Sequence, residues 1–115
     1  MESRLIYESS KLYLDKVKWF LPSDISESEW IHTGLGNDLN KEFVSELIDQ
    51  HFAGENLFLS MGRKSSRPIE KSWFKSQLEN FIGITDFVLW DENFQSVIEV
   101  NKIGVLRKGL NDGKL

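Results

Sequence analysis

The hydrophobic pattern of this chain changes its period near Thr85, and this change most limits the folds open to it. Before that point, two segments carry apolar residues at the spacing of amphipathic helices, which we predict at residues 38–53 and 68–82. After it, apolar and polar residues alternate with a period of two, as in half-buried strands. The pattern predicts an α+β fold, in which an antiparallel β-meander has amphipathic helices packed on one face.

Caps and turn residues set the expected boundaries of these helices. The helix at residues 38–53 begins at Asn37 or Asp38 and ends at Gly54. Pro68 suits the first turn of the second helix.

The chain before residue 38 is harder to interpret. Residues 3–21 predict a further helix that stops at Pro22, with a hairpin turning at residues 9–10 as the alternative. Ser26 and Glu29 have the spacing of a capping box, which predicts a short helical turn that carries Trp30.

The predicted strands lie in the second half of the chain, with one buried strand at residues 57–61 before them. A hairpin is expected from residues 87–90 and 94–100, with Asn93 in the left-handed conformation at the end of its loop. Residues 103–106 form another strand, and the polar tail from Gly109 is expected to fray.

The composition fits one compact domain spanning residues 1–115, because 40% apolar content at this length can build a core without metal ions or disulfides. The absence of cysteine fits a reducing compartment. No apolar run is long enough to cross a bilayer and no signal-peptide core is present, so we expect a cytoplasmic protein without a membrane partner. A net charge of −4 argues against nucleic acid as a partner.

Candidates for chemistry are few, because the chain has two histidines, His32 and His51. His51 falls on the apolar face of the predicted helix at residues 38–53, where a structural role is favoured and a catalytic base is the alternative. Neither histidine has other ligands at metal-binding spacing, so no metal site and no cofactor are predicted. The basic loop from Arg63 to Arg67 precedes a predicted helix start, which leaves open an anion site or a solvated loop.

Charge is unevenly distributed, since residues 23–55 hold eight carboxylates and one lysine. Four of these carboxylates fall within an arc of roughly 80° on the helix face opposite the apolar stripe. Carboxylates spaced by four residues repel one another, so this acidic face is either an ordinary solvated helix face or a docking surface that meets positive charge on a partner. The four residues are Asp38, Glu42, Glu46 and Asp49.

Tryptophans provide the expected apolar contacts. Trp73 and Trp90 are predicted to lie in the core. Trp30, next to Glu27 and Glu29, is either a core residue or an exposed anchor surrounded by negative charge.

The segment at residues 87–101, Phe-Val-Leu-Trp-Asp-Glu-Asn-Phe-Gln-Ser-Val-Ile-Glu-Val-Asn, is similar to the β-meander of some small bacterial immunity proteins. Such proteins neutralise the toxins of contact-dependent inhibition and related polymorphic systems. The resemblance implies a mechanism in which an acidic surface occupies or overlies the basic, phosphate-binding cleft of a toxin nuclease.

Together these features predict a non-enzymatic binding protein whose partner is a cognate toxin domain with a basic surface. A regulatory or scaffold module, and a small hydrolase that uses His32 or His51, are the alternatives. The sequence leaves the oligomeric state open. The expected partner-binding residues are Asp38, Glu42, Glu46, Asp49, Trp30, Glu27 and Glu29.

Overall fold

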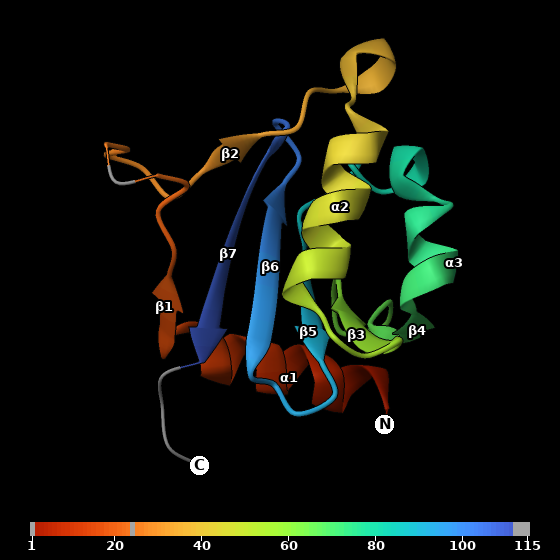
Figure 1. Ribbon diagram of the computed structural model, residues 1–115. Coiled ribbons are helices and arrows are strands. Elements are labelled where there is room, and N and C mark those ends of the chain that lie inside the picture. The colour runs from red at the N-terminus through yellow and green to blue at the C-terminus, as the bar shows by residue number, and fades with distance from the viewer. Residues whose placement is uncertain (1, 24, 112–115) are drawn as a thin grey trace.

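A computed structural model describes residues 2–23 and 25–111, which form a seven-stranded antiparallel sheet with helices against it (Figure 1). The helices are α1 (Ser3–Leu14), α2 (Lys41–His51) and α3 (Lys71–Lys75), with 3-10 turns η1 (Gly36–Asp38) and η2 (Leu78–Asn80). The strands are β1 (Val17–Trp19), β2 (Ile31–His32), β3 (Asn56–Ser60), β4 (Arg67–Glu70), β5 (Phe87–Asp91), β6 (Ser96–Asn101) and β7 (Val105–Asn111). The strand order is β1-β7-β6-β5-β3-β4, and β2 also pairs with β7.

The core has two parts, one on each face of the sheet. Leu89 and Ile98 belong to the cluster that α2 and α3 cover, whereas Trp90 and Val97 pack with Tyr13 of α1 on the other face (Figure 1). The α+β class and the antiparallel sheet are therefore confirmed, but the expectation that the helices share one face is corrected. Because residues 87–90 are all buried, the sheet needs cover on both sides.

The first helix is shorter than the sequence predicts, and the hairpin alternative is wrong. It ends at Leu14, and residues 17–19 form β1 instead of its last turns. Val17 keeps the helical spacing, but it pairs with Asn111 in the sheet. Backbone pairing with a distant strand thus overrides a local helical pattern.

The capping box at Ser26 and Glu29 does not start a helix. The hydroxyl of Ser28 accepts a hydrogen bond from the backbone N–H of Trp30, and the chain then enters β2, where Ile31 pairs with Leu106. The prediction of a helical turn carrying Trp30 is therefore wrong.

The helix predicted at residues 38–53 is present as α2, with its start moved to Lys41. Asn40 caps it, since its side-chain oxygen accepts the N–H of Phe43 at 3.1 Å. Residues 36–38 form η1, and the helix ends at His51, with Phe52 rather than Gly54 as its C-terminal boundary.

The helix predicted at residues 68–82 begins later and is broken. Residues 67–70 form the edge strand β4, and only α3 and η2 are helical. The backbone N–H of Lys71 donates to the carbonyl of Glu55, toward β3. In an antiparallel pair, alternate residues point their backbone N–H and C=O groups toward the partner strand, so those of Pro68 point to the free edge. The missing N–H of proline therefore removes no hydrogen bond between β3 and β4.

The hairpin of β5 and β6 is confirmed, but its left-handed residue is Phe94, at φ +54°, and not Asn93. The ring of Phe94 is buried and lies 5.4 Å from the ring of Trp90 and 5.2 Å from that of Phe58, measured between centroids. The side chain of Asp91 accepts the N–H of Gln95 at 2.7 Å. Aromatic burial thus offsets an unfavourable backbone conformation that costs about 1–2 kcal/mol.

The chain does not fray at Gly109. Strand β7 continues through Asn111, and a Cβ added at Gly109 would lie 2.5 Å from the carbonyl oxygen of Lys18, because β1 and β7 meet closely there. The rest of the predicted tail, residues 112–115, lies outside the described residues. Within the described ranges, no helix has the length and apolar character needed to cross a bilayer.

Candidate functional site

The structure separates the predicted partner-binding residues into two groups on opposite faces of the sheet. Leu106 of β7 belongs to the cluster beneath α2, so its neighbour Arg107 faces the side that α1 covers. Trp30 stacks on Arg107 and therefore lies on that second side, away from the acidic residues of α2.

The acidic residues of α2 are not equivalent. Glu42 and Glu46 are exposed, and neither forms an ion pair with any residue in the described ranges 2–23 and 25–111. Asp38 is also exposed and unpaired by the same measure, but it lies in η1 before the helix begins. Lys41 extends to Glu79 of η2, at 3.4 Å between Nζ and Oε2.

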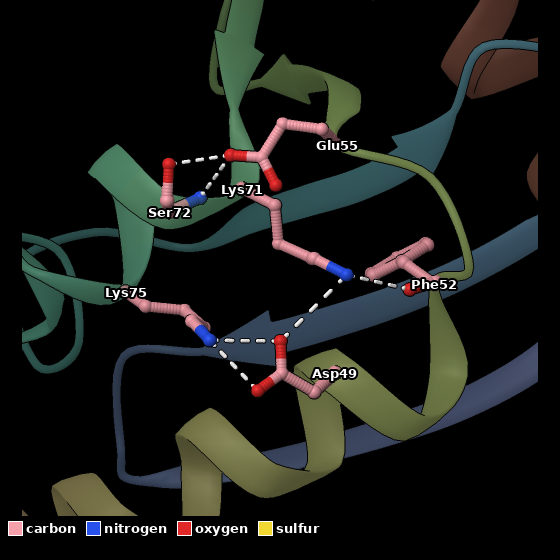
Figure 2. A network of polar contacts seen from close by, with 6 residues as sticks. All are labelled: Asp49, Phe52, Glu55, Lys71, Ser72 and Lys75. Atoms are coloured by element: carbon pink, nitrogen blue, oxygen red, sulfur yellow. Dashed lines mark hydrogen bonds and ion pairs between the residues drawn. The ribbon is translucent and has the colours of Figure 1, made fainter.

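Asp49, in contrast, is held by two lysines (Figure 2). Its Oδ2 lies 2.7 Å from the Nζ of Lys75, and its Oδ1 lies 3.6 Å from the Nζ of Lys71. The hydrogen bond from Lys75 holds the pKa of the Asp49 carboxyl below its usual value. This residue therefore joins α2 to α3, and its charge is compensated within the chain, whereas the sequence predicts an uncompensated acidic face.

The same network continues to the chain that follows α2 (Figure 2). Lys71 donates to the carbonyl of Phe52 at 2.9 Å, which satisfies an oxygen at the end of the helix. Glu55 accepts the backbone N–H of Ser72 at 2.8 Å and also its hydroxyl, and these bonds lower the pKa of Glu55. Lys71 and Lys75 were not among the residues predicted from the sequence, although their spacing of four residues signals one helix face.

The second group is organised by Arg107. Its Nε lies 2.6 Å from Glu99, and its Nη1 lies 3.0 Å from Glu29. The guanidinium carbon is 3.9 Å from the ring centroid of Trp19 and 4.6 Å from that of Trp30. We call these five residues the Arg107 cluster.

Trp30 and Glu29, which were predicted to bind a partner, are part of the Arg107 cluster. Both are partly buried and bonded within the protein, so they do not form an exposed anchor with free negative charge. Glu27 is exposed and forms no ion pair among the residues described. Arg107 was missed, but Glu99 and Arg107 are cross-strand partners about the turn after Asn101, and that register could have indicated the pair.

The basic loop does not precede a helix. Pro68 lies in β4, and the backbone N–H of Ser66 is taken by the hydroxyl of Ser3 at 2.9 Å. Arg63 pairs with Glu8, while the guanidinium of Arg67 lies 5.4 Å from the ring centroid of Trp73. The helix start on which the anion hypothesis depended is therefore absent from this loop.

The two histidines give little support to a hydrolase. His32 is exposed in β2, and the Nε2 of His51 is 2.9 Å from the carbonyl oxygen of Gly109. Neither ring bonds a carboxylate within the part of the chain that the structure describes. A hollow of about 190 Å³ between α1 and the sheet is lined by neither histidine. Two hollows of about 390 and 410 Å³ beside β4 reach the roughly 300–1,000 Å³ of ligand pockets, but they too are lined by neither histidine.

His51 makes stability depend on pH. Burial lowers the pKa of His51 from its usual 6.5, so below pH 6.5 the unfolded chain takes up a proton that the folded chain does not. The contribution of neutral His51 is therefore complete above pH 6.5 and is lost as the pH falls below it. Urea unfolding at about pH 7.5 and about pH 5.5 will show a smaller pH dependence in His51→Gln than in the wild type.

The exposed His32 supplies the control, because His32→Gln leaves the surroundings of His51 unchanged. Equal pH dependence in the wild type and His51→Gln would contradict this account.

Comparisons of the chain with family models, curated proteins and solved structures found no match. Among the described residues, no group of three or more His, Asp or Glu side chains is placed to hold a metal ion. The candidate site therefore rests on the positions of charged side chains in this structure. The carboxylates of the predicted acidic face that have no ion-pair partner among the described residues are Asp38, Glu42 and Glu46.

Proposed function

We propose that this chain is a non-enzymatic binding protein that docks a basic protein partner through the outer face of α2. The observation that carries the proposal is the contrast between the carboxylates of this helix. Asp49 is paired with lysines of α3, whereas Glu42 and Glu46 have no ion-pair partner among the described residues. Because they lie one helical turn apart, their mutual repulsion is relieved when positive charge approaches.

The partner class that we propose is a bacterial toxin with a basic, nuclease-type cleft. A nuclease must bind phosphate, so its cleft presents lysine and arginine side chains. Carboxylates at a spacing of one helical turn can occupy such a cleft in place of phosphates. The proposed activity is inhibition in the cytoplasm, and the lack of cysteine fits that compartment.

A charge-reversal variant tests the proposal. Glu42→Lys/Glu46→Lys will slow association with the product of the gene immediately upstream by roughly tenfold or more at low salt, because steering by complementary charge is lost. The melting temperature will change little, since both side chains are exposed and unpaired in the described chain. Stopped-flow fluorescence measures the rate, and differential scanning fluorimetry measures the stability.

Asp15→Lys/Glu92→Lys is the matched control, because it changes the net charge equally at exposed positions outside α2 and outside the predicted partner-binding residues. Equal slowing in both double variants would show a general effect of charge and remove α2 as the docking face. Inhibition of the partner's nuclease activity distinguishes an immunity protein from a regulatory or scaffold module, which would bind without inhibiting.

A further inference from the structure

Three large apolar side chains lie exposed together at the end of the molecule where α2 begins. Leu35, Ile84 and Ile103 are 40%, 68% and 70% exposed, respectively. The turn that carries residues 36–38 and the turn between β6 and β7 lie at this same end (Figure 1). We call these three residues the end patch.

Contacts of Leu35 bring the end patch together. A Cβ added at Gly83 or at Gly104 would lie 2.9 Å from a side-chain carbon of Leu35, so this side chain packs directly on two glycine turns. The next residue after Gly83 is Ile84, and the residue before Gly104 is Ile103. Three segments far apart in the sequence thus meet at Leu35, and each of them carries an exposed apolar residue.

The backbone beneath the end patch is held by hydrogen bonds. The N–H of Thr33 donates to the carbonyl of Gly104 at 2.9 Å, and the side chain of Asp86 accepts the N–H of Lys102 at 2.7 Å. The side-chain oxygen of Asn101 accepts the N–H of Ile103 at 3.0 Å. A surface fixed in this way loses little conformational freedom on binding.

A cavity of about 240 Å³ opens beside the end patch. Its lining includes the apolar residues Leu35, Leu39, Ile82 and Ile84, together with Glu79. A lined cavity next to exposed apolar side chains is the arrangement in which an interface receives one anchoring side chain of its partner.

The charges around the end patch are mainly negative. Asp38 and Glu42 are exposed and without an ion pair in the described chain, and Asp86 is exposed beyond its hydrogen bond to Lys102. Of the nearby lysines, Lys41 is already paired with Glu79, while Lys102, which precedes Ile103, is exposed and adds one positive charge to this margin. An apolar centre with an acidic margin complements a protein surface that presents an apolar side chain among lysines and arginines.

We propose that the end patch is the apolar centre of the docking surface, and that it receives one apolar side chain of a basic protein partner beside the acidic face of α2. This inference rests on the proposed function and adds the anchor that the sequence analysis sought at Trp30. A second copy of the chain is a poorer occupant, because a two-fold contact would bring the same carboxylates opposite one another.

A random library of 12-residue peptides displayed on phage provides the probe. Panning against the wild-type chain is expected to enrich peptides with an apolar residue flanked by lysine or arginine. The dissociation constants of the synthesised peptides will rise roughly tenfold or more for Ile84→Ser/Ile103→Ser. Leu5→Ser/Leu12→Ser is the matched control, because these leucines of α1 are 49% and 59% exposed and lie on the other side of the sheet.

Each other outcome has a distinct meaning. Basic peptides whose binding depends on Glu42 and Glu46 but not on Ile84 and Ile103 would overturn the end patch and leave the proposed function standing. Peptides insensitive to both pairs, or no enrichment at all, would count against both proposals. A dimer in sedimentation velocity that Ile84→Ser/Ile103→Ser abolishes would assign the end patch to a second copy and overturn the inference.

Discussion

Trp90→Ala is expected to lower the free energy of unfolding by about 3–5 kcal/mol, the usual range for removing a large aromatic side chain from a core. Trp90 is 0% exposed, and its indole N–H donates to the hydroxyl of Ser10 at 2.9 Å. Its ring also contacts the rings of Tyr13 and Phe94. Since small domains are stable by about 5–15 kcal/mol, this one change removes much of the total.

Trp73→Ala is the matched control, and it also tests a correction to the sequence analysis. Trp73 was predicted to lie in the core with Trp90, but it is 41% exposed beside β4. Its loss should cost well under half as much, because much of its surface already contacts water. Urea unfolding followed by circular dichroism measures both variants, and equal losses would contradict the difference in burial between the two tryptophans.

Arg107→Ala is expected to lower the free energy of unfolding by about 2–3 kcal/mol. The change leaves Glu29 and Glu99 without their cation and removes the stacking of Trp19 and Trp30 on a guanidinium. The side chain of Arg107 is 22% exposed, so the loss of stability is smaller than for a fully buried ion pair.

Two further variants separate the parts of this effect. Arg63→Ala removes an ion pair whose side chains are 62% and 51% exposed, and it should cost at most about 0.5 kcal/mol. Arg107→Lys keeps the charge but loses the planar group, so it should fall between the wild type and Arg107→Ala. Wild-type stability in Arg107→Ala would show that the cluster does not hold β1 and β2 against β7.

Local patterns were sufficient for the parts of the fold that form between neighbours in the sequence. The stripe of Val44, Leu47 and Ile48 predicted α2, and the change of pattern after residue 85 predicted β5 and β6. The apolar run at residues 87–90 is, however, buried on both faces and not half-buried. The helical stripe at Phe74 and Leu78 was also correct in burial, although Pro68 placed the start of that helix too early.

The errors concern contacts between distant segments. Val17 has the spacing of a helical residue, but residues 17–19 pair with residues 109–111 as a strand. The sequence of residues 17–19 does not indicate this pairing. Asp49 and Lys75 are 26 residues apart. The spacing of residues within α2 therefore predicted the acidic face, but it could not predict that Lys75 neutralises Asp49. The acidic face could therefore be predicted from the sequence, while its reduction to Asp38, Glu42 and Glu46 required the packing of α3 on α2.

Pro68 also affects whether the sheets of two molecules of this protein can pair edge to edge. Strand β4 is the last strand on its side of the sheet, and an unprotected strand there could template the growth of ordered aggregates. The proline ring removes a donor from the outward-facing backbone, so a foreign strand finds an interrupted set of hydrogen bonds. Lengthening of the sheet from one molecule to the next is therefore disfavoured at the β4 edge.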